Sequence, residues 1–573
     1  MNEMKDNEYD DINRILSSIY GQKQGQDAFR RILRLIASFA PGSKRETDYF
    51  NESDVILITY GDSLEQKDRS PVTVLHQFAA DYLKNIFSTI HILPFFPYSS
   101  DDGFSVVDYF QVNPVIGTWE DIQQIQQNFK LMFDLVLNHI SAESQWFQSY
   151  LNEEQGYQDL AIEIDPSEDL SLVTRPRSLP LLTEKKKSNG KIVHVWTTFS
   201  SDQIDLNYRS PEVLEKMVQV LMCYAQKGAA ILRLDAVAYL WKEIGTRCIH
   251  LPQTHDMVKL FRAILNRIAP ETLIVTETNV PHEENISYFG DGKNEAQMVY
   301  NFTLPPLLLH TLLKGDAVKL SKWAKTLDSI STDTTFFNFT ASHDGIGVRP
   351  LEGILTTEEI DDLIRSVVSN GGHVSYKKNP DGSESPYELN ITYLDALKAP
   401  LEDMDVYHIQ RFIASQAIAM VMPGVPGVYI HSLLGTPNWL EGVLNTRRFR
   451  TINRKKLQYD QVITKLKDPE TSCFRIFSAY IELIKIRVLQ PAFHPNSGVA
   501  VHDVDFRVFL IERRCRNQVI VAVTNVSNMP VMLSLSEYYT PAQMEDLISG
   551  KWFDTGSIRL NPYQVLWLTR HVS

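Results

Sequence analysis

The chain has 573 residues, of which 43% are hydrophobic and 22% charged, a composition typical of a globular protein with one large domain and one or two smaller ones. Its formal net charge of −14 at pH 7 argues against a nucleic-acid or anionic-membrane partner, because both require a basic protein surface. The four cysteines lack zinc-ligand spacing, the N-terminus is polar, and no apolar stretch is long enough to span a bilayer. We therefore expect a cytoplasmic protein with reduced thiols.

Residues 1 to about 50 predict helix, because apolar side chains recur at spacings of three and four residues. Short apolar runs then alternate with helical patterns. We expect strands at residues 55–60, 89–96, 131–139, 231–237, 273–277, 298–302, 336–342 and 425–431. We expect helices at residues 72–87, from 118 onward, and at 212–226, 254–268, 305–327, 357–370 and 407–422. Eight strand–helix units favour a closed (β/α)8 barrel over an open sheet.

The alternation stops after His139, and residues 140–207 show no strong period, which predicts an inserted subdomain over the barrel mouth. After a helix near residues 473–488, short alternating strands predict a small C-terminal β-sandwich. The predicted fold class is therefore α/β. It consists of a (β/α)8 TIM barrel with an insertion after strand three, a helical N-terminal extension and a C-terminal β domain. We place their boundaries at residues 1–50, 51–490 with insertion 140–207, and 491–573.

The expected strand within Gly228–Val237 carries Arg233 and Asp235 in an otherwise apolar run. Side chains two residues apart point to the same face of a strand, so the two charges lie together. A structural ion pair explains this stretch when it is taken alone, because buried charges are costly unless they are paired.

Other expected strands also end in groups that can do chemistry. Strand three ends with Asn138 and His139, strand five ends with Glu277, and strand seven ends with His343 and Asp344. Active sites of such barrels lie at the C-terminal ends of the strands, and crowded carboxylates shift one another's pKa. Three carboxylates and two imidazoles on one face therefore predict a catalytic site.

The combination of residues indicates the type of reaction. Three carboxylates without metal-ligand spacing and without a Ser-His-Asp order indicate glycosyl transfer. A retaining reaction requires one carboxylate as nucleophile and one carboxylic acid as proton donor, and a third can stabilise positive charge in the transition state.

Four segments resemble the four conserved regions of the α-amylase superfamily, glycoside hydrolase family 13. They are Asp134-Leu-Val-Leu-Asn-His139, the run from Gly228 to Asp235, Val275-Thr-Glu-Thr-Asn279 and Ser342-His-Asp344. The resemblance implies that Asp235 is the nucleophile, Glu277 the acid/base and Asp344 the transition-state stabiliser. It also implies that the glucosyl ring is held by Arg233, His139 and His343.

A finer resemblance connects the chain to the sucrose phosphorylase subgroup. It rests on Ser100-Asp101-Asp102-Gly103-Phe104, Arg175-Pro-Arg177 and Ile452-Asn-Arg454, among other motifs. This resemblance implies that Asp101 and Arg454 pair around the distal glucose hydroxyls. Further ring contacts are expected from Phe104, Phe199, Gln203 and Tyr239. Arg177 is the best candidate to bind phosphate, because a guanidinium holds this anion bidentately.

The acceptor, the alcohol whose oxygen carries the glucosyl group, is indicated by residues 376–390. This loop keeps Tyr387, but Glu388 stands where sucrose phosphorylases have glutamine, so fructose recognition is in doubt and both residues are expected to contact a different acceptor. The helical N-terminal extension, Trp196-Thr-Thr-Phe-Ser200 and the run from Asn379 to Glu388 resemble the glucosylglycerate phosphorylases, and the likeness extends along nearly the full length of the chain. That resemblance implies phosphorolysis of 2-O-α-glucosylglycerate to α-D-glucose 1-phosphate and D-glycerate through a glucosyl-enzyme.

Several alternatives remain open. A phosphorylase of sucrose, sucrose 6′-phosphate or glucosylglycerol would use the same mechanism, and an α-glucosidase or transglucosylase would use water or a sugar instead of phosphate. A non-catalytic barrel is disfavoured because all three carboxylates are present. We expect no organic cofactor, phosphate being a co-substrate, and no metal, because the acidic cluster that calcium needs is not evident. The expected partners are small molecules, and the expected state is a monomer or homodimer.

Overall fold

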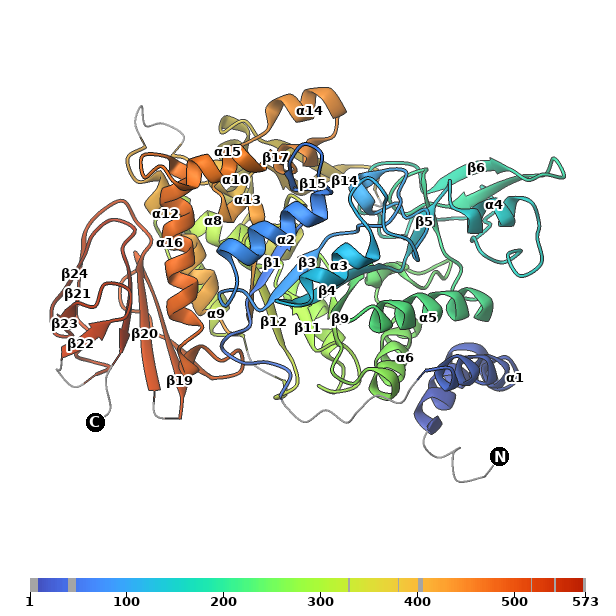
Figure 1. Ribbon diagram of the computed structural model, residues 1–573, viewed down its shortest axis with the longest axis horizontal. Helices are drawn as coiled ribbons and strands as arrows, with labels where there is room; N and C mark the ends of the chain where they lie inside the picture. The colour runs from blue at the N-terminus through green and yellow to red at the C-terminus, as the bar shows by residue number, and fades with distance from the viewer. Residues whose placement is uncertain are drawn as a thin grey trace.

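The computed structural model describes residues 9–39, 48–327, 330–379, 381–399, 405–516, 518–539 and 543–569. Eight parallel strands close into a barrel at the centre of the molecule (Figure 1). In chain order they are β1 (Ile56–Thr59), β3 (Thr89–Ile92), β4 (Lys130–Val136), β9 (Ala229–Asp235), β10 (Leu273–Thr276), β11 (Met298–Tyr300), β12 (Thr335–Phe339) and β16 (Val425–Tyr429). The prediction of an eight-stranded closed barrel is confirmed.

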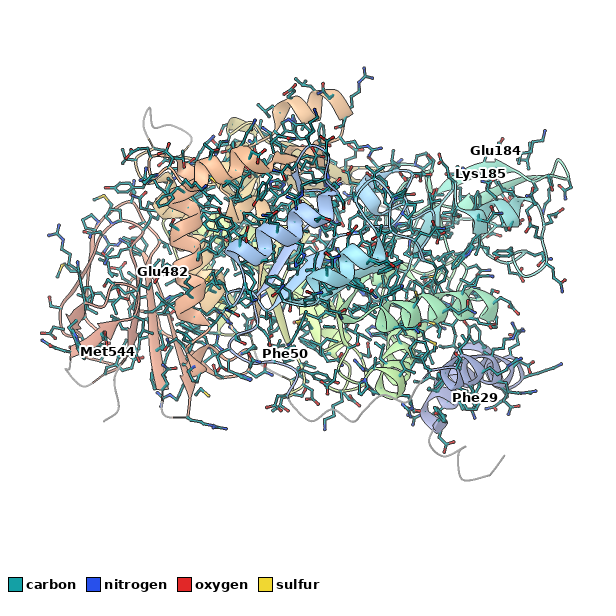
Figure 2. All side chains as sticks on the ribbon, viewed as in Figure 1. Phe29, Phe50, Glu184, Lys185, Glu482 and Met544 are labelled. Carbon is teal, nitrogen blue, oxygen red and sulfur yellow. The ribbon has the colours of Figure 1, made fainter. Side chains whose placement is uncertain are left out.

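The barrel strands are short apolar runs because both of their faces are covered, the inner one by the barrel core and the outer one by helices. Side chains fill the space between the strands and the helices around them (Figure 2). The ladder between β4 and β9 pairs Asp134 with Arg233 and Val136 with Asp235. This register brings charged residues from two strands to the same level inside the barrel.

Helices surround the barrel. The longer ones are α2 (Pro71–Tyr82), α5 (Pro211–Gln226), α6 (Pro252–Ile268), α8 (Leu304–Lys314), α10 (Thr357–Ser369), α12 (His408–Val421) and α16 (Ser472–Arg487). Shorter ones are α3 (Trp119–Ile125), α7 (His282–Ile286), α9 (Val318–Ala324), α11 (Tyr393–Ala396), α13 (Ile430–Leu433), α14 (Leu440–Thr446) and α15 (Tyr459–Leu466). Thr118 caps α3 in a capping box with Asp121.

Several predicted elements are wrong in detail, including the strands expected at residues 89–96 and 336–342, which end at Ile92 and Phe339. The single helix expected at residues 305–327 is two helices, α8 and α9, because Gly315 adopts a left-handed conformation (φ 67°) that ends α8. The strand expected at residues 131–139 ends at Val136, and His139 begins a new strand, β5 (His139–Ser141).

The insertion after β4 returns to the barrel mouth. It contains α4 (Gln145–Leu151), β6 (Leu182–Lys186), β7 (Ile192–Trp196) and β8 (Gln203–Asp205). Antiparallel pairing of β5 with β8 sets His139 beside Asp205 and Ser141 beside Gln203. A second small sheet, β13 (Ile346–Gly347), β15 (Glu384–Asn390) and β14 (His373–Lys378), also borders the mouth. It places Glu388 next to Gly347.

The C-terminal region, red in Figure 1, is built from β18 to β25. Six strands form one sheet: β18 (Gly498–Val501), β19 (Val508–Cys515), β20 (Gln518–Asn525), β25 (Val565–Thr569), β22 (Gln543–Asp546) and β23 (Trp552–Asp554). A two-stranded sheet, β21 (Val531–Leu533) with β24 (Ile558–Leu560), shares a separate apolar cluster with one face of it. The opposite face contributes Phe509, Ile520 and Trp567 to the main core.

The N-terminal helix α1 (Asp10–Ala37) breaks at Gly21 and lies against α5 and α6 (Figure 1). Its Arg31 pairs with Glu212 at 2.6 Å, and its Asp11 pairs with Arg267 at 2.7 Å. The rest of the predicted N-terminal extension, residues 1–8 and 40–47, lies outside the described residues. No described helix has the length and apolarity needed to cross a membrane.

Gly427 on β16 provides a test of barrel packing. A Cβ at this position would overlap the ring of Phe337 on β12, so Gly427→Ala overpacks the core. We expect a loss of about 1–3 kcal/mol in the free energy of unfolding. Gly498→Ala is the matched control, because the nearest atom there would be 3.4 Å away. Equal urea midpoints for the two variants would contradict this account of the barrel.

Candidate active site

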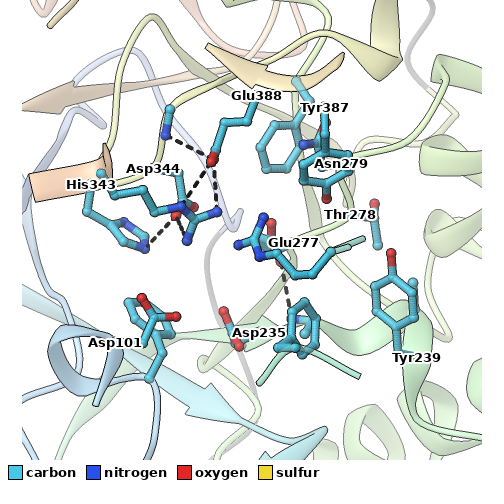
Figure 3. A pocket seen from close by; sticks show the side chains of 18 of the residues that line it. Asp101, Asp235, Tyr239, Glu277, Thr278, Asn279, His343, Asp344, Tyr387 and Glu388 are labelled. Carbon is cyan, nitrogen blue, oxygen red and sulfur yellow. Dashed lines mark hydrogen bonds and ion pairs between the residues drawn. The ribbon is translucent and has the colours of Figure 1, made fainter. Parts of the chain in front are cut away.

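A pocket opens at the C-terminal ends of the barrel strands, and the charged residues of the expected site meet there (Figure 3). Every predicted site residue except Arg454 lines it. These residues are Asp101, Phe104, His139, Arg177, Phe199, Gln203, Arg233, Asp235, Tyr239, Glu277, His343, Asp344, Tyr387 and Glu388. They come from barrel strand ends, the insertion and the β13–β15–β14 sheet, so the pocket exists only in the complete fold.

The three carboxylates occupy three different barrel positions. Asp235 ends β9, Glu277 directly follows β10, and Asp344 lies in the loop after β12 (Figure 3). The residue after Asp235, Ala236, has a left-handed backbone (φ 50°), and its N–H donates to Glu277 Oε2 at 3.1 Å. A strained backbone of this kind persists only where the surroundings hold it, which is common at active sites.

The charges at the end of β9 form the predicted ion pair. Arg233 Nη1 donates to Asp235 Oδ1 at 2.8 Å and also to Asp134 Oδ1. Asp235 nevertheless lines the pocket, so the pair belongs to the site rather than to the core alone. Burial works against the charge on Arg233, but Asp134, Tyr300 and Asp235 raise its pKa well above the usual value.

The carboxylates have different pKa values for physical reasons. Burial raises the pKa of Glu277 and of Asp235, and neighbouring carboxylates add to the effect while Arg233 opposes it. For Asp344 burial is outweighed by Arg450 and Arg454, which lower its pKa. The direct ion pair with Arg233 favours the ionised form of Asp235. The pKa of Asp235 is raised further than that of Glu277, but the direct contact of Asp235 with the Arg233 guanidinium outweighs its burial, so we place the proton of this cluster on Glu277.

Aromatic and imidazole rings line one side of the pocket. The rings of His343 and Phe104 stack with centroids 4.7 Å apart, and Phe199 meets Tyr239 edge to face at 5.6 Å. His139 Nε2 lies 2.8 Å from the carbonyl oxygen of Phe104. Burial lowers the pKa of His343 well below its usual value, so this side offers neutral, flat surfaces suited to a sugar ring.

Arg454 lies behind the pocket wall rather than on it. Its Nη1 is 2.6 Å from Asp102 Oδ2 but 3.6 Å from Asp101 Oδ1, so its nearer partner is Asp102 instead of the expected Asp101. Both aspartates have a positive φ, and the turn they form directs one carboxylate to Arg454 and leaves the other at the pocket. Arg454 also donates from Nε to the carbonyl oxygen of His343 at 2.8 Å.

Arg450 is a site residue that sequence reasoning missed. Its Nη1 lies 2.6 Å from Asp344 Oδ1, and its Nε and Nη2 donate to the two oxygens of Glu388 at 3.0 and 2.8 Å. Glu388 also accepts the N–H of Gly345 at 3.0 Å, so its buried carboxylate is fully engaged. Its position four residues before Arg454 did not mark it, because its carboxylate partners lie far away in the sequence.

Asn279 was also missed, although it follows the predicted acid/base Glu277 by only two positions. It lines the pocket near Tyr387 (Figure 3), and its side-chain oxygen is buried without a hydrogen bond to any described residue.

The oxygen atoms beside the end of β4 surround an ammonium group. Lys242 Nζ lies 2.6 Å from Asn138 Oδ1 and 2.6 Å from Asp205 Oδ2, and it donates to the carbonyl of Tyr239. Within the described ranges, no group of three or more His, Cys, Asp or Glu side chains is placed to hold a metal ion.

Buried carboxylates at the C-terminal face of a (β/α)8 barrel, beside a wall of aromatic rings, define an enzyme that acts on glycosidic bonds. A family model for the alpha-amylase catalytic domain matches residues 79–348. The glucosylglycerate phosphorylase of Spirochaeta thermophila is 45% identical over 98% of each chain, and that of Escherichia coli is 46% identical over 92% of this chain and 93% of its own. The chain belongs to the glucosylglycerate phosphorylase family of the alpha-amylase superfamily.

A solved structure agrees with this assignment. The sucrose 6F-phosphate phosphorylase of Thermoanaerobacter thermosaccharolyticum superposes with a TM-score of 0.73 at 26% identity, covering 89% of this chain and 98% of its own.

The acid role of Glu277 is testable. Glu277→Gln should lower the turnover of a glucoside with an alcohol leaving group by about 10²–10⁴-fold. It should spare glucosylation from α-glucosyl fluoride, because fluoride leaves without a proton. The protonated form that acts as acid is lost as pH rises through the raised pKa of Glu277, so the alkaline limb of the pH–rate profile should also disappear.

Glu283→Gln, on the exposed surface of α7, is the control for this experiment. Equal losses on the two substrates in Glu277→Gln would refute the assignment of the acid.

Proposed function

We propose that this protein is a retaining phosphorylase that converts 2-O-α-D-glucosylglycerate and phosphate into α-D-glucose 1-phosphate and D-glycerate. The observation that carries the proposal is 45% identity over 98% of both chains to a protein named glucosylglycerate phosphorylase. The pocket supplies the groups that this reaction needs.

In the first step Asp235 attacks the anomeric carbon while Glu277 gives its proton to the departing glycerate oxygen. The C1–O bond to glycerate breaks, and a glucosyl ester forms on Asp235. Asp344, kept ionised by Arg450 and Arg454, stabilises the positive charge that develops on the sugar ring.

In the second step an oxygen of hydrogen phosphate attacks the same carbon and displaces Asp235. The phosphate proton passes to Glu277, which restores the acid, and α-D-glucose 1-phosphate leaves as the dianion. Two inversions at one carbon retain the α configuration.

Arg177 supports the choice of anionic acceptors. Arg233 and Arg450, the other arginines that line the pocket, are bound to carboxylates, whereas Arg177 has no hydrogen bond or ion pair to any described residue. Its guanidinium lies 5.6 Å from the ring centroid of Tyr387. A guanidinium whose N–H groups have no hydrogen bond to a described residue suits a site that holds the glycerate carboxylate in one half-reaction and phosphate in the other.

No organic cofactor or metal enters this scheme. A cytoplasmic location and a monomeric or homodimeric state remain part of the proposal, as does the division into an N-terminal extension, a barrel with its insertion and a C-terminal β domain. Free phosphate as co-substrate is consistent with the proposed location.

The acceptor can be tested in the reverse direction by phosphate release from α-D-glucose 1-phosphate. We expect fast release with D-glycerate and slow release with glycerol, fructose, fructose 6-phosphate, glucose or no acceptor. Fast release with fructose or its phosphate would move the protein to the sucrose-type phosphorylases. Equal release in all reactions, including the one without acceptor, would mean that water takes the glucosyl group.

Arg177→Ala should raise the KM for phosphate and for D-glycerate by about 10- to 100-fold, the effect expected from losing a hydrogen bond to a charged group. Slow hydrolysis without phosphate should stay near the wild-type rate. Lys186→Ala removes a charge from the exposed face of the same insertion and serves as the control. An unchanged phosphate KM in Arg177→Ala would remove this residue from the anion site.

A further inference from the structure

A line of buried charges continues beneath the pocket. His91 on β3 and Asp134 on β4 are both 0% exposed, and His91 Nε2 lies 2.6 Å from Asp134 Oδ2. The other oxygen of Asp134 accepts a hydrogen bond from Arg233 Nη1, which also donates to Asp235 at 2.8 Å. The chain of contacts therefore runs from His91 through Asp134 and Arg233 to Asp235.

One guanidinium nitrogen serves two carboxylates in this line. Asp134 is buried completely and needs a partner at each oxygen, because an unpaired buried carboxylate oxygen is costly. With His91 in place, Arg233 has to satisfy only Oδ1 of Asp134. Without it, the Asp134 carboxylate would turn both oxygens toward Arg233 and draw the guanidinium away from Asp235, because two-point pairing with arginine is the stronger arrangement.

The proton on the His91 ring can be placed from its neighbours. Nε2 faces a carboxylate oxygen and must carry a hydrogen, whereas Nδ1 is buried without a hydrogen bond to any described residue. His91 does not line the pocket, so its influence on the reaction passes through Asp134.

We propose that His91 is a positioning residue for the nucleophile: by donating Nε2–H to Asp134, it holds Arg233 against Asp235 and keeps Asp235 ionised. The proposal rests on the proposed role of Asp235 as nucleophile and adds a residue three contacts behind it. Burial opposes ionisation of Asp134, but Arg233 and His91 lower its pKa, in agreement with the geometry.

Other ionisable groups face the same carboxylates. Those around Asp235 are Arg233, Glu277, Asp134 and Asp344, and those around Asp134 are His91, Arg233 and His343, with Tyr109, Tyr224 and Tyr300 close to one or both. A substitution of His91 keeps every other ionisable group in this set. A shift in the titration of Asp235 can therefore be attributed to the lost contact between His91 and Asp134.

The test is the pH dependence of kcat/KM for glucosylation by α-glucosyl fluoride. This substrate needs no proton from Glu277 and no particular acceptor, so the acid limb of its profile reports Asp235. We expect His91→Leu to move the acid limb to higher pH by about one unit. At pH values below the limb kcat/KM should fall about tenfold, and at pH values above it kcat/KM should change little. His91→Gln, which keeps an N–H donor, should lie between His91→Leu and the wild type.

The control is His310→Leu, which removes another buried histidine, on α8 and away from the pocket. It should affect stability without moving the acid limb. The proposal would be overturned if His91→Leu lowered kcat/KM equally at every pH or left it unchanged. If that variant is insoluble, an acid limb at the wild-type position in both His91→Gln and His91→Asn would overturn it. Acceptor-independent phosphate release by the wild type would overturn the proposed function instead, without affecting this result.

Discussion

The buried guanidinium of Arg233 is the interaction on which the rest of the site depends. It lies inside a barrel core, where a single positive charge is tolerated only because Asp134 and Asp235 bind it. Two carboxylates around one cation leave a net negative charge, and of the two only Asp235 lines the pocket. The ion pair that joins two strands therefore also contributes a carboxylate to the pocket, the one proposed above as the nucleophile. The packing of the barrel and the charge at the pocket share one contact, which the parallel register of β4 with β9 makes possible.

A second positive group organises the opposite wall. Arg450 joins Asp344, in the loop after β12, to Glu388 on β15, so a barrel loop and a peripheral sheet are fixed to each other by charge. Glu388 is engaged by this contact, whereas Arg177 lies over the Tyr387 ring and has no hydrogen bond or ion pair in the part of the chain that the structure describes. The pocket thus combines cations already neutralised by the protein with one that is available to substrate. This division gives a physical reason why an anionic acceptor suits the site.

Much of this arrangement could be predicted from sequence. The barrel strands are short apolar runs, and the residues after them share one end of the barrel in any (β/α)8 fold. Asp235, Glu277 and Asp344 could therefore be grouped without coordinates. Arg450 could not, because its partners are 62 and more positions away and nothing local marks them. The preference of Arg454 for Asp102 over Asp101 depends on a turn of two left-handed residues. Gly315 is a signal for the end of α8, but the apolar pattern continues on both sides of it and predicts one helix.

Lys242 holds the insertion to the barrel by placing its ammonium among oxygens of Asn138, Asp205 and Tyr239. Because this cation belongs to a side chain, it cannot dissociate into solution as a free ion can. The positive charge beside Asp205 is therefore part of the chain itself, next to His139 and Tyr239 at the pocket mouth. Because this ammonium is buried, added salt should screen the contact only weakly and cannot exchange the cation.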